Sequence, residues 1–330
     1  MNEKRTLAFV LLAAVTLASV GSHLLAHRLR IIRDAVRVDV IGPGHATLPI
    51  QVTGSSLVFY GIDWEKIATI TDHEILAYGS PSASPCEIEA MPLVEKEAAL
   101  RVIGISAYDM NERNLSDYRA ALVPVEQAAS DLWTGHEDWP FAKRVFSQYP
   151  LQASRTLFPT AGLSTPVMVR LRDEARALFS HGPVLAAGVH DSDLADERLS
   201  DWEPGRVGRN IATIRTAIAG GTHIYGRTKR LALLRLLARC SAAGPTMLIV
   251  MPVSPAYRAA FLRPEDDVAL DQILADAQKS SPSVELIRID KNSALNESSN
   301  FCDIIHLNRA ARGQSTPGVI AAISRLTKQP

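Results

Sequence analysis

The feature that most constrains the fold of this 330-residue chain is a series of short apolar runs, rich in branched side chains, with turn residues behind them. Runs of this kind are typical of strands that are buried on both faces of a sheet. They cover residues 48–52, 74–78, 100–105, 246–251 and 284–289. Stretches of helical period lie between them, at residues 85–99, 227–242 and 266–279. The alternation predicts an α/β fold with a doubly wound, parallel five-stranded sheet and helices on both of its faces.

One interval breaks this rhythm, from about residue 106 to about residue 245. It is far longer than a single crossover and contains the long aromatic stretches of the chain. We expect a mostly helical insertion packed over the strand ends, which either shapes a substrate cleft or lid or enlarges the core as a helical layer. The α/β domain is expected to cover residues 45–326, after a linker at 26–44 and before a tail at 327–330.

The N-terminal region contains an almost uncharged apolar run at residues 7–25, after a short tail at residues 1–6 that carries Lys4 and Arg5. A helix of that length nearly crosses a hydrocarbon core of roughly 30 Å. The run is an uncleaved signal anchor or a cleaved signal peptide; its length and the lack of a small-x-small site before His23 favour a transmembrane anchor. A helix buried in the domain explains the basic flanks less well. Because basic residues also follow the run, orientation is less constrained, and we expect an extracytoplasmic domain, periplasmic or at the cell surface.

Composition argues against several classes of function. Lysine plus arginine equals aspartate plus glutamate at 35 each, so no overall field attracts nucleic acid, and no nucleic-acid partner is expected. Three cysteines, Cys86, Cys240 and Cys302, lie far apart without paired spacing or a histidine cluster, which leaves open one disulfide with a spare thiol but indicates no zinc site. No metal-binding or dinucleotide-binding motif is present, so no metal and no cofactor are expected.

A first chemical signal lies at residues 52–63, where a predicted strand runs into Gly54, Ser55, Ser56 and Leu57 and then into a helix. A serine at such a turn is exposed at the carboxyl edge of the sheet, close to helix N-terminal amides that stabilise negative charge. Ser56 is therefore a candidate nucleophile. A turn with a helix cap would give the same local pattern.

A second signal lies about 250 residues later, where Asp303 and His306 precede the C-terminal helix. A serine hydroxyl needs a base to take its proton, and a histidine base needs a carboxylate to orient its ring and stabilise its charged form. A D-x-x-H turn supplies both groups from one loop, although a capping aspartate and a buried histidine would look the same. The two signals together favour the catalytic interpretation.

With these two blocks the sequence resembles the SGNH/GDSL hydrolase superfamily, and especially its envelope branch, which is similar to the alginate O-acetylation factors and the D-alanine transfer protein of teichoic acids. The resemblance covers most of residues 45–326. The GDSL block is matched by residues 54–57, with Ser55 in place of the usual aspartate, and the D-x-x-H block by residues 303–306. It implies a flavodoxin-like sheet of the SGNH type, with Ser56 as nucleophile, His306 as base and Asp303 as the residue that orients the base.

The middle blocks of that superfamily fit less closely. The second block usually supplies a glycine amide to the oxyanion hole, and here Gly79 or the amide of Ser82 would take that place. The third usually reads G-x-N-D, whereas this chain has Ser106 at the asparagine position, with Asp109 and Asn111 as accessory candidates. A missing donor costs on the order of 3 kcal/mol of transition-state stabilisation. Asp109 has a second interpretation as a helix cap or structural carboxylate.

The resemblance and the expected anchor together predict a membrane-anchored serine esterase or O-acyltransferase that acts on an acyl ester of a cell-envelope or exported polysaccharide. Its expected partners are an acylated carbohydrate or other ester substrate, the membrane through residues 7–25, and other envelope proteins that modify polysaccharide. The alternative is a catalytically inactive binding or assembly protein with the same fold for polysaccharide export or modification. A lipase or peptidase for small substrates is a third interpretation, which differs mainly in cleft shape.

Overall fold

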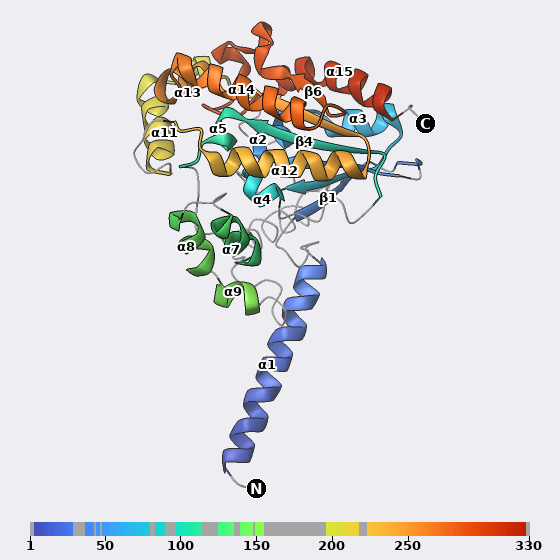
Figure 1. Ribbon diagram of the computed structural model, residues 1–330, viewed down its shortest axis with the longest axis vertical. Coiled ribbons are helices and arrows are strands. Elements are labelled where there is room, and N and C mark those ends of the chain that lie inside the picture. Colours follow the sequence, from blue (N-terminus) through green and yellow to red (C-terminus); the bar gives the residue numbers. More distant parts are fainter. Residues whose placement is uncertain are drawn as a thin grey trace.

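The computed structural model of this protein describes residues 3–28, 37–42, 44–46, 48–79, 83–89, 97–113, 125–134, 139–147, 149–154, 196–217 and 223–327. Within these ranges the chain forms a six-stranded sheet in the order β1-β3-β2-β4-β5-β6 (Figure 1). The strands are β1 (Arg37–Ile41), β2 (Ile50–Gly54), β3 (Ile75–Gly79), β4 (Leu100–Ser106), β5 (Thr246–Met251) and β6 (Glu285–Arg288). The five strands from β3 to β6 are parallel, and β1 pairs antiparallel with β3 at the edge. The fold is therefore α/β with a mixed, mostly parallel sheet.

The five parallel strands are the five that the sequence predicts, but the sixth strand is a correction. Residues 37–41 lie in the segment expected to be a linker, and they pair with β3 from Arg37 opposite Gly79 to Ile41 opposite Ile75. The sequence RVDVI alternates valine with charged residues and has no continuous apolar run. Such a short alternating strand is stabilised mainly by its pairing at a sheet edge, which local pattern does not reveal.

The helices cover both faces of the sheet, as a doubly wound fold requires. Figure 1 shows α12 and α4 on one face and α2, α3 and α15 on the other. The described helices are α1 (Glu3–Arg28), α2 (Ser56–Gly61), α3 (Trp64–Thr71), α4 (Pro85–Glu89), α5 (Ala107–Met110), α7 (Val125–Trp133), α8 (Trp139–Ser147), α9 (Tyr149–Ser154), α11 (Pro204–Ala217), α12 (Arg227–Ala243), α13 (Pro255–Phe261), α14 (Pro264–Ser280) and α15 (Arg309–Leu326). Short 3-10 turns are η1 (Leu199–Asp201), η2 (Ile289–Lys291), η3 (Ser293–Leu295) and η4 (Ser298–Asn300).

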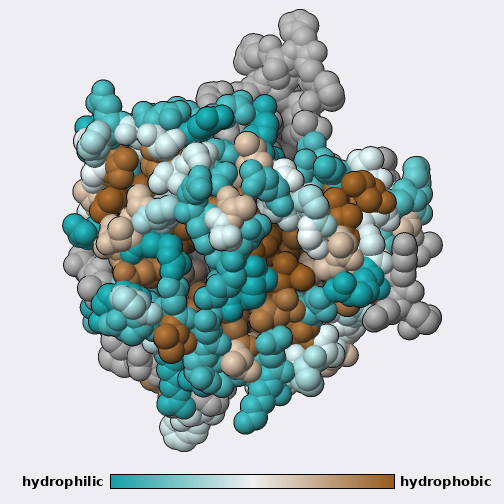
Figure 2. Space-filling model, turned by 90° about the horizontal axis from the view of Figure 1, so that it is seen from above, coloured by the Kyte–Doolittle hydropathy of each residue, from teal (hydrophilic) through white to brown (hydrophobic). Residues whose placement is uncertain are grey.

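Several helices begin at residues that cap them. Asp63 accepts the N–H of Lys66 at 3.0 Å at the start of α3, and Asn308 accepts the N–H of Ala311 at 3.0 Å at the start of α15. These side-chain oxygens satisfy N–H groups that have no partner within the helix. Figure 2 shows that the face formed by α13, α14 and α15 is mainly hydrophilic, with hydrophobic groups in smaller patches between polar ones. This is the pattern of helices that bury one side against a sheet.

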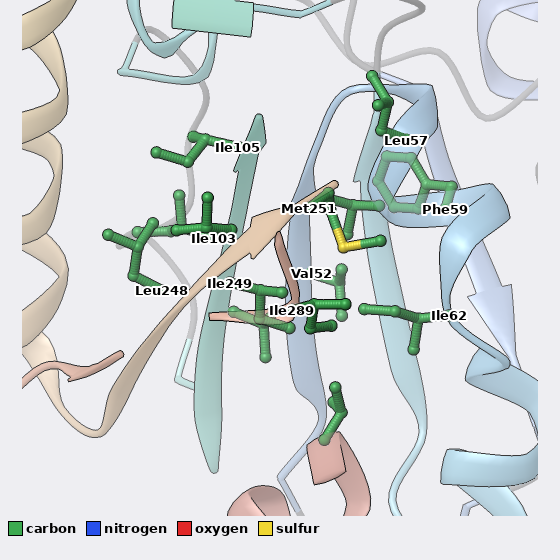
Figure 3. Packing of buried hydrophobic residues seen from close by; sticks show 14 of the residues in the cluster. Val52, Leu57, Phe59, Ile62, Ile103, Ile105, Leu248, Ile249, Met251 and Ile289 are labelled. Atoms are coloured by element: carbon green, nitrogen blue, oxygen red, sulfur yellow. The ribbon is translucent and has the colours of Figure 1, made fainter. Parts of the chain in front are cut away.

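The core lies between the central strands and the helices that cover them. Figure 3 shows side chains of β2, β4 and β5 packed against those of α2, the turn after it and η2. The labelled residues are Val52, Leu57, Phe59, Ile62, Ile103, Ile105, Leu248, Ile249, Met251 and Ile289, and all are buried. Burial of a large apolar side chain contributes roughly 1.5–3 kcal/mol, so this cluster fixes the position of α2 against the strands.

The described parts of the predicted insertion are mostly helical, with short non-helical stretches such as residues 223–226, and they lie in different places. Residues 155–195 lie outside the described residues. Figure 1 places α7 and α8 beside α4 and α12, and a small core joins Ala128 and Val145 to Cys86 and Ala232. This part enlarges the core. The stretch 196–217 instead contacts the loop before α15, where the N–H of Leu199 donates to the Phe301 carbonyl at 2.7 Å.

The helix expected at residues 7–25 is present as part of α1, which extends away from the sheet and its helices in Figure 1. The side chains of Leu12, Leu17 and Leu24 are mostly exposed along it. Among the described residues, no helix meets the combined length and apolarity that a membrane crossing requires.

Candidate active site

The candidate nucleophile lies at the turn between β2 and α2. Strand β2 ends at Gly54, Ser55 has an extended backbone and caps the helix, and Ser56 is the first helical residue. Residue 104 on the neighbouring strand has to be glycine for α2 to pack so closely, because a Cβ there would lie 1.8 Å from the Cγ2 atom of Val58. The turn thus holds Ser56 at the carboxyl edge of the parallel strands.

The structure brings the three predicted catalytic residues together. The Oγ atom of Ser56 lies 2.9 Å from Nε2 of His306, and Nδ1 of His306 lies 2.7 Å from Oδ2 of Asp303. The Ser56 hydroxyl is therefore within hydrogen-bond reach of His306. Because an ionised carboxylate only accepts hydrogen bonds, Asp303 orients His306 with its proton on Nδ1, and Nε2 is left to accept the Ser56 proton.

The carboxylate of Asp303 is held at both oxygens. Its Oδ1 accepts the backbone N–H groups of Ile305 and His306, each at 2.7 Å, while Oδ2 accepts from the ring. Burial by itself would raise the pKa of this carboxyl, but the positive charge and ring hydrogen bond of His306, with the two backbone donors, hold the pKa of Asp303 below its usual value. The residue therefore stays ionised at neutral pH.

The loop that carries Asp303 and His306 is braced from within and from β5. The N–H of Cys302 donates to the His306 carbonyl at 2.9 Å, which closes the turn. The hydroxyl of Ser254, just after β5, donates to the Ile304 carbonyl at 2.6 Å and accepts the N–H of Tyr257 at 3.1 Å. Ser254 is not among the residues predicted from the sequence, although a serine followed by proline after a predicted strand is a helix-start signal that would identify it.

Two further side chains border the triad. The Tyr60 ring, one helical turn after Ser56, meets the His306 ring edge to face with centroids 5.4 Å apart. Cys302 is buried, and burial together with the nearby Asp303 charge raises the pKa of its thiol to about 12. Since the thiolate is the reactive form, Cys302 acts as a packing residue here.

The three residues predicted to form the oxyanion hole differ in how well their positions fit that role. Gly79 on β3 is paired with Gly54 on β2, and Gly54 is two residues before Ser56 in the chain. Gly79 therefore lies at the same edge of the sheet as Ser56. Ser82 lies outside the described residues. Ser106 also lies at this edge, but its hydroxyl is fully buried and donates its proton to Oδ2 of Asp109 at 2.8 Å. That proton is not directed at a substrate, so the assignment of the Ser106 hydroxyl as an oxyanion donor does not fit this geometry.

The two accessory candidates are buried in the turn after β4. Asn111 is fully buried, and its side-chain oxygen accepts the N–H groups of Arg113 and Ile224 at 3.2 and 3.3 Å. It therefore closes the loop rather than facing an open site. Asp109 is fully buried too, and it accepts hydroxyl protons from both Ser55 and Ser106. Both side chains therefore form hydrogen bonds inside the protein and do not face a substrate.

The arrangement can perform base-assisted attack by a serine hydroxyl. Within the part of the chain that the structure describes, no group of three or more His, Cys, Asp or Glu side chains is arranged to hold a metal ion. Neither protein-family models nor curated proteins give a match to this chain.

Proposed function

We propose that this protein is a serine esterase or O-acyltransferase with an SGNH/GDSL-type site. The observation that carries the proposal is the hydrogen-bonded series Ser56, His306 and Asp303, with distances of 2.9 and 2.7 Å. Ser56 lies at the turn after β2, and Asp303 and His306 lie in the loop before α15, the last helix. The GDSL-like and D-x-x-H blocks support the same assignment.

In the proposed reaction the Ser56 hydroxyl attacks the carbonyl carbon of an ester. His306 takes the Ser56 proton as the carbon–oxygen bond forms, and Asp303 stabilises the charged ring. The N–H groups of Leu57 and Val58 donate to Ser55, so the N–H of Ser56 itself, the first residue of α2, is the one suited to stabilise the oxyanion. When the intermediate collapses, His306 gives the proton to the leaving alcohol. Water or a sugar hydroxyl then releases the acyl group from Ser56 with His306 again as base.

The proposed substrate is an acyl ester of a cell-envelope or exported polysaccharide. This part of the proposal rests on the resemblance to envelope proteins and on the expected anchor at residues 7–25. Anchoring is tested by extracting membranes with alkaline carbonate, using the full chain and a variant that lacks residues 1–28. Release of the full chain together with the variant would remove the anchor from the proposal.

A second candidate is a binding or assembly protein that keeps the fold without catalysis. One observation favours it: the Ser106 hydroxyl, at the position of the usual oxyanion donor, is committed to Asp109. The intact geometry of Ser56, His306 and Asp303 favours the enzyme instead.

Covalent labelling of the purified full chain with a fluorophosphonate distinguishes the two candidates. We expect labelling of the wild type that is lost in Ser56→Ala and in His306→Ala. Ser241→Ala is the matched control, because Ser241 is a half-buried serine on α12 whose hydroxyl donates to the Ala238 carbonyl. A folded wild type that never labels would favour the binding protein.

A further inference from the structure

Outside the triad, the carboxylate of Asp109 is buried beside the nucleophile turn and accepts hydrogen bonds from two serines. One oxygen, Oδ2, accepts the hydroxyl proton of Ser55 at 3.0 Å and that of Ser106 at 2.8 Å. Ser55 follows β2 and Ser106 ends β4, and these strands are parallel neighbours. All three side chains are fully buried. Asp109 thus links the nucleophile turn to the end of the adjacent strand.

The link fixes the direction of the Ser55 hydroxyl. A carboxylate has no proton to donate, so the single Ser55 proton must lie toward Asp109. The lone pairs of the Ser55 oxygen then face the first turn of α2, where they accept the N–H of Leu57 at 3.4 Å. The hydroxyl of Ser55 is therefore both a cap for α2 and a tether to Asp109, and Ser56 is the next residue.

Asp109 itself is held in place by the surrounding chain. Its own N–H donates to the Ser106 hydroxyl oxygen at 3.2 Å. Lys229, also fully buried, donates from Nζ to the carbonyl oxygens of Asp109 at 2.8 Å and Asn111 at 2.6 Å. A buried carboxylate requires hydrogen bonds and nearby positive charge; the two serine hydroxyls supply the hydrogen bonds, and Lys229 of α12 supplies the charge. The carboxylate is therefore held in a fixed position, and the Ser55–Ser56 turn is hydrogen-bonded to it through Ser55.

We propose that Asp109 is a positioning residue, which sets the Ser55–Ser56 turn so that the Ser56 hydroxyl faces the substrate. The inference rests on the proposed function of Ser56. It also accounts for the departure from GDSL at residue 55. A carboxylate at that position would face Asp109 within hydrogen-bond distance, and two like charges so close cannot both ionise. In this chain the acceptor is Asp109 on α5, just after the neighbouring strand β4, and residue 55 is the donor.

The test separates positioning from folding by measuring two quantities in one fluorophosphonate experiment. The final extent of labelling reports the folded, competent fraction of the full chain. The rate constant at saturating probe reports the orientation of Ser56. We expect Asp109→Ala to lower this rate constant by on the order of 10²-fold at unchanged probe affinity. Asp109→Asn retains an oxygen that accepts both hydroxyls, so it should stay within about tenfold of wild type.

The matched control is Asp266→Ala. Asp266 is also a buried carboxylate, and it accepts the N–H of Arg263 at 2.8 Å at the start of α14, with no bond to the Ser55–Ser56 turn among the described residues. We expect it to change the labelled fraction but not the rate constant. If Asp109→Ala behaves like this control, or labels at the wild-type rate constant, the positioning role is refuted.

Failure of the proposed function gives a different result, because the wild type itself would not label. Hydrogen exchange of the peptide at residues 52–60 then decides the positioning claim. Asp109→Ala should speed exchange of the Leu57 amide while Asp266→Ala does not. Unchanged exchange in Asp109→Ala would overturn the inference independently of catalysis.

Discussion

Replacing Asp303 by asparagine should abolish Ser56 reactivity while the fold is kept. In the wild type, one carboxylate oxygen accepts two backbone N–H groups and the other accepts the ring N–H of His306. An amide has one oxygen and one NH₂ group, so it can satisfy only one side as an acceptor. Turning the NH₂ group toward Ile305 and His306 would leave two backbone donors facing a donor. The amide oxygen should therefore stay with the backbone.

That choice places the new NH₂ group against Nδ1 of His306. The ring then has to accept at Nδ1, which moves its proton to Nε2, the atom that lies 2.9 Å from the Ser56 oxygen. A histidine in this tautomer donates to Ser56 and cannot take its proton. Loss of the correct tautomer in a triad lowers turnover on the order of 10⁴-fold, and we expect a fall of that order in the labelling rate constant.

The assay is the saturating fluorophosphonate rate constant of Asp303→Asn, with circular dichroism as the control for folding. A stability measurement adds an independent check. Because interactions with the charged form hold the pKa of Asp303 below its unfolded value near 4, the carboxylate stabilises the wild type above that pH, and the contribution is lost as pH falls through the folded pKa. The difference in unfolding free energy between wild type and variant should shrink in acid. A folded variant that labels within tenfold of wild type would refute the tautomer argument.

Two further changes are tested by their effect on folding stability. Ser254→Ala removes the cap of α13 and leaves the buried Ile304 carbonyl without its donor, so it should lower the unfolding free energy by about 2 kcal/mol in urea denaturation; a loss below about 0.5 kcal/mol would contradict the brace. His223 is fully buried, and burial, opposed by Asp266 and assisted by Lys229 and Arg263, lowers its pKa to about 4. Wild-type stability should therefore fall as pH drops from about 6.5 to 4, by up to roughly 3 kcal/mol, because the unfolded chain binds the proton more readily. His223→Phe should lose this part of the pH dependence, and an unchanged profile would exclude His223 as its source.

The parallel part of the fold could be predicted because each of its strands is a continuous apolar run. Burial on both faces leaves little room for polar residues, so the pattern is local. The edge strand β1 could not be predicted in this way, since RVDVI depends on pairing with β3. The placement of α7 and α8 beside α4 and α12 likewise depends on which helical faces meet in three dimensions.

The triad could be predicted because the order of strands and helices places its residues at the same edge of the sheet, although they are far apart in the sequence. Ser56 follows a parallel strand and His306 precedes the last helix, and parallel strands direct their carboxyl ends to one edge of the sheet. The prediction that the Ser106 hydroxyl is an oxyanion donor depends on the alignment of blocks alone. Yet Ser106 and Asp109 form an S-x-x-D pattern, which is a helix-start signal, and it indicates a hydroxyl that is turned toward its own helix.

The carboxyl edge shows why Ser56 is suited to react and its neighbours are not. Ser55, Ser106 and Ser254 each follow or end a parallel strand, each caps the next helix, and each is fully buried. Their protons go to the Asp109 carboxylate or to the Ile304 carbonyl, oxygens that are too weakly basic to take a serine proton near neutral pH. Among the serines at this edge that the structure describes, the Ser56 hydroxyl meets a histidine nitrogen. The buried serines cap the helices, whereas Ser56, one residue beyond a cap and only partly buried, keeps its hydroxyl at the histidine.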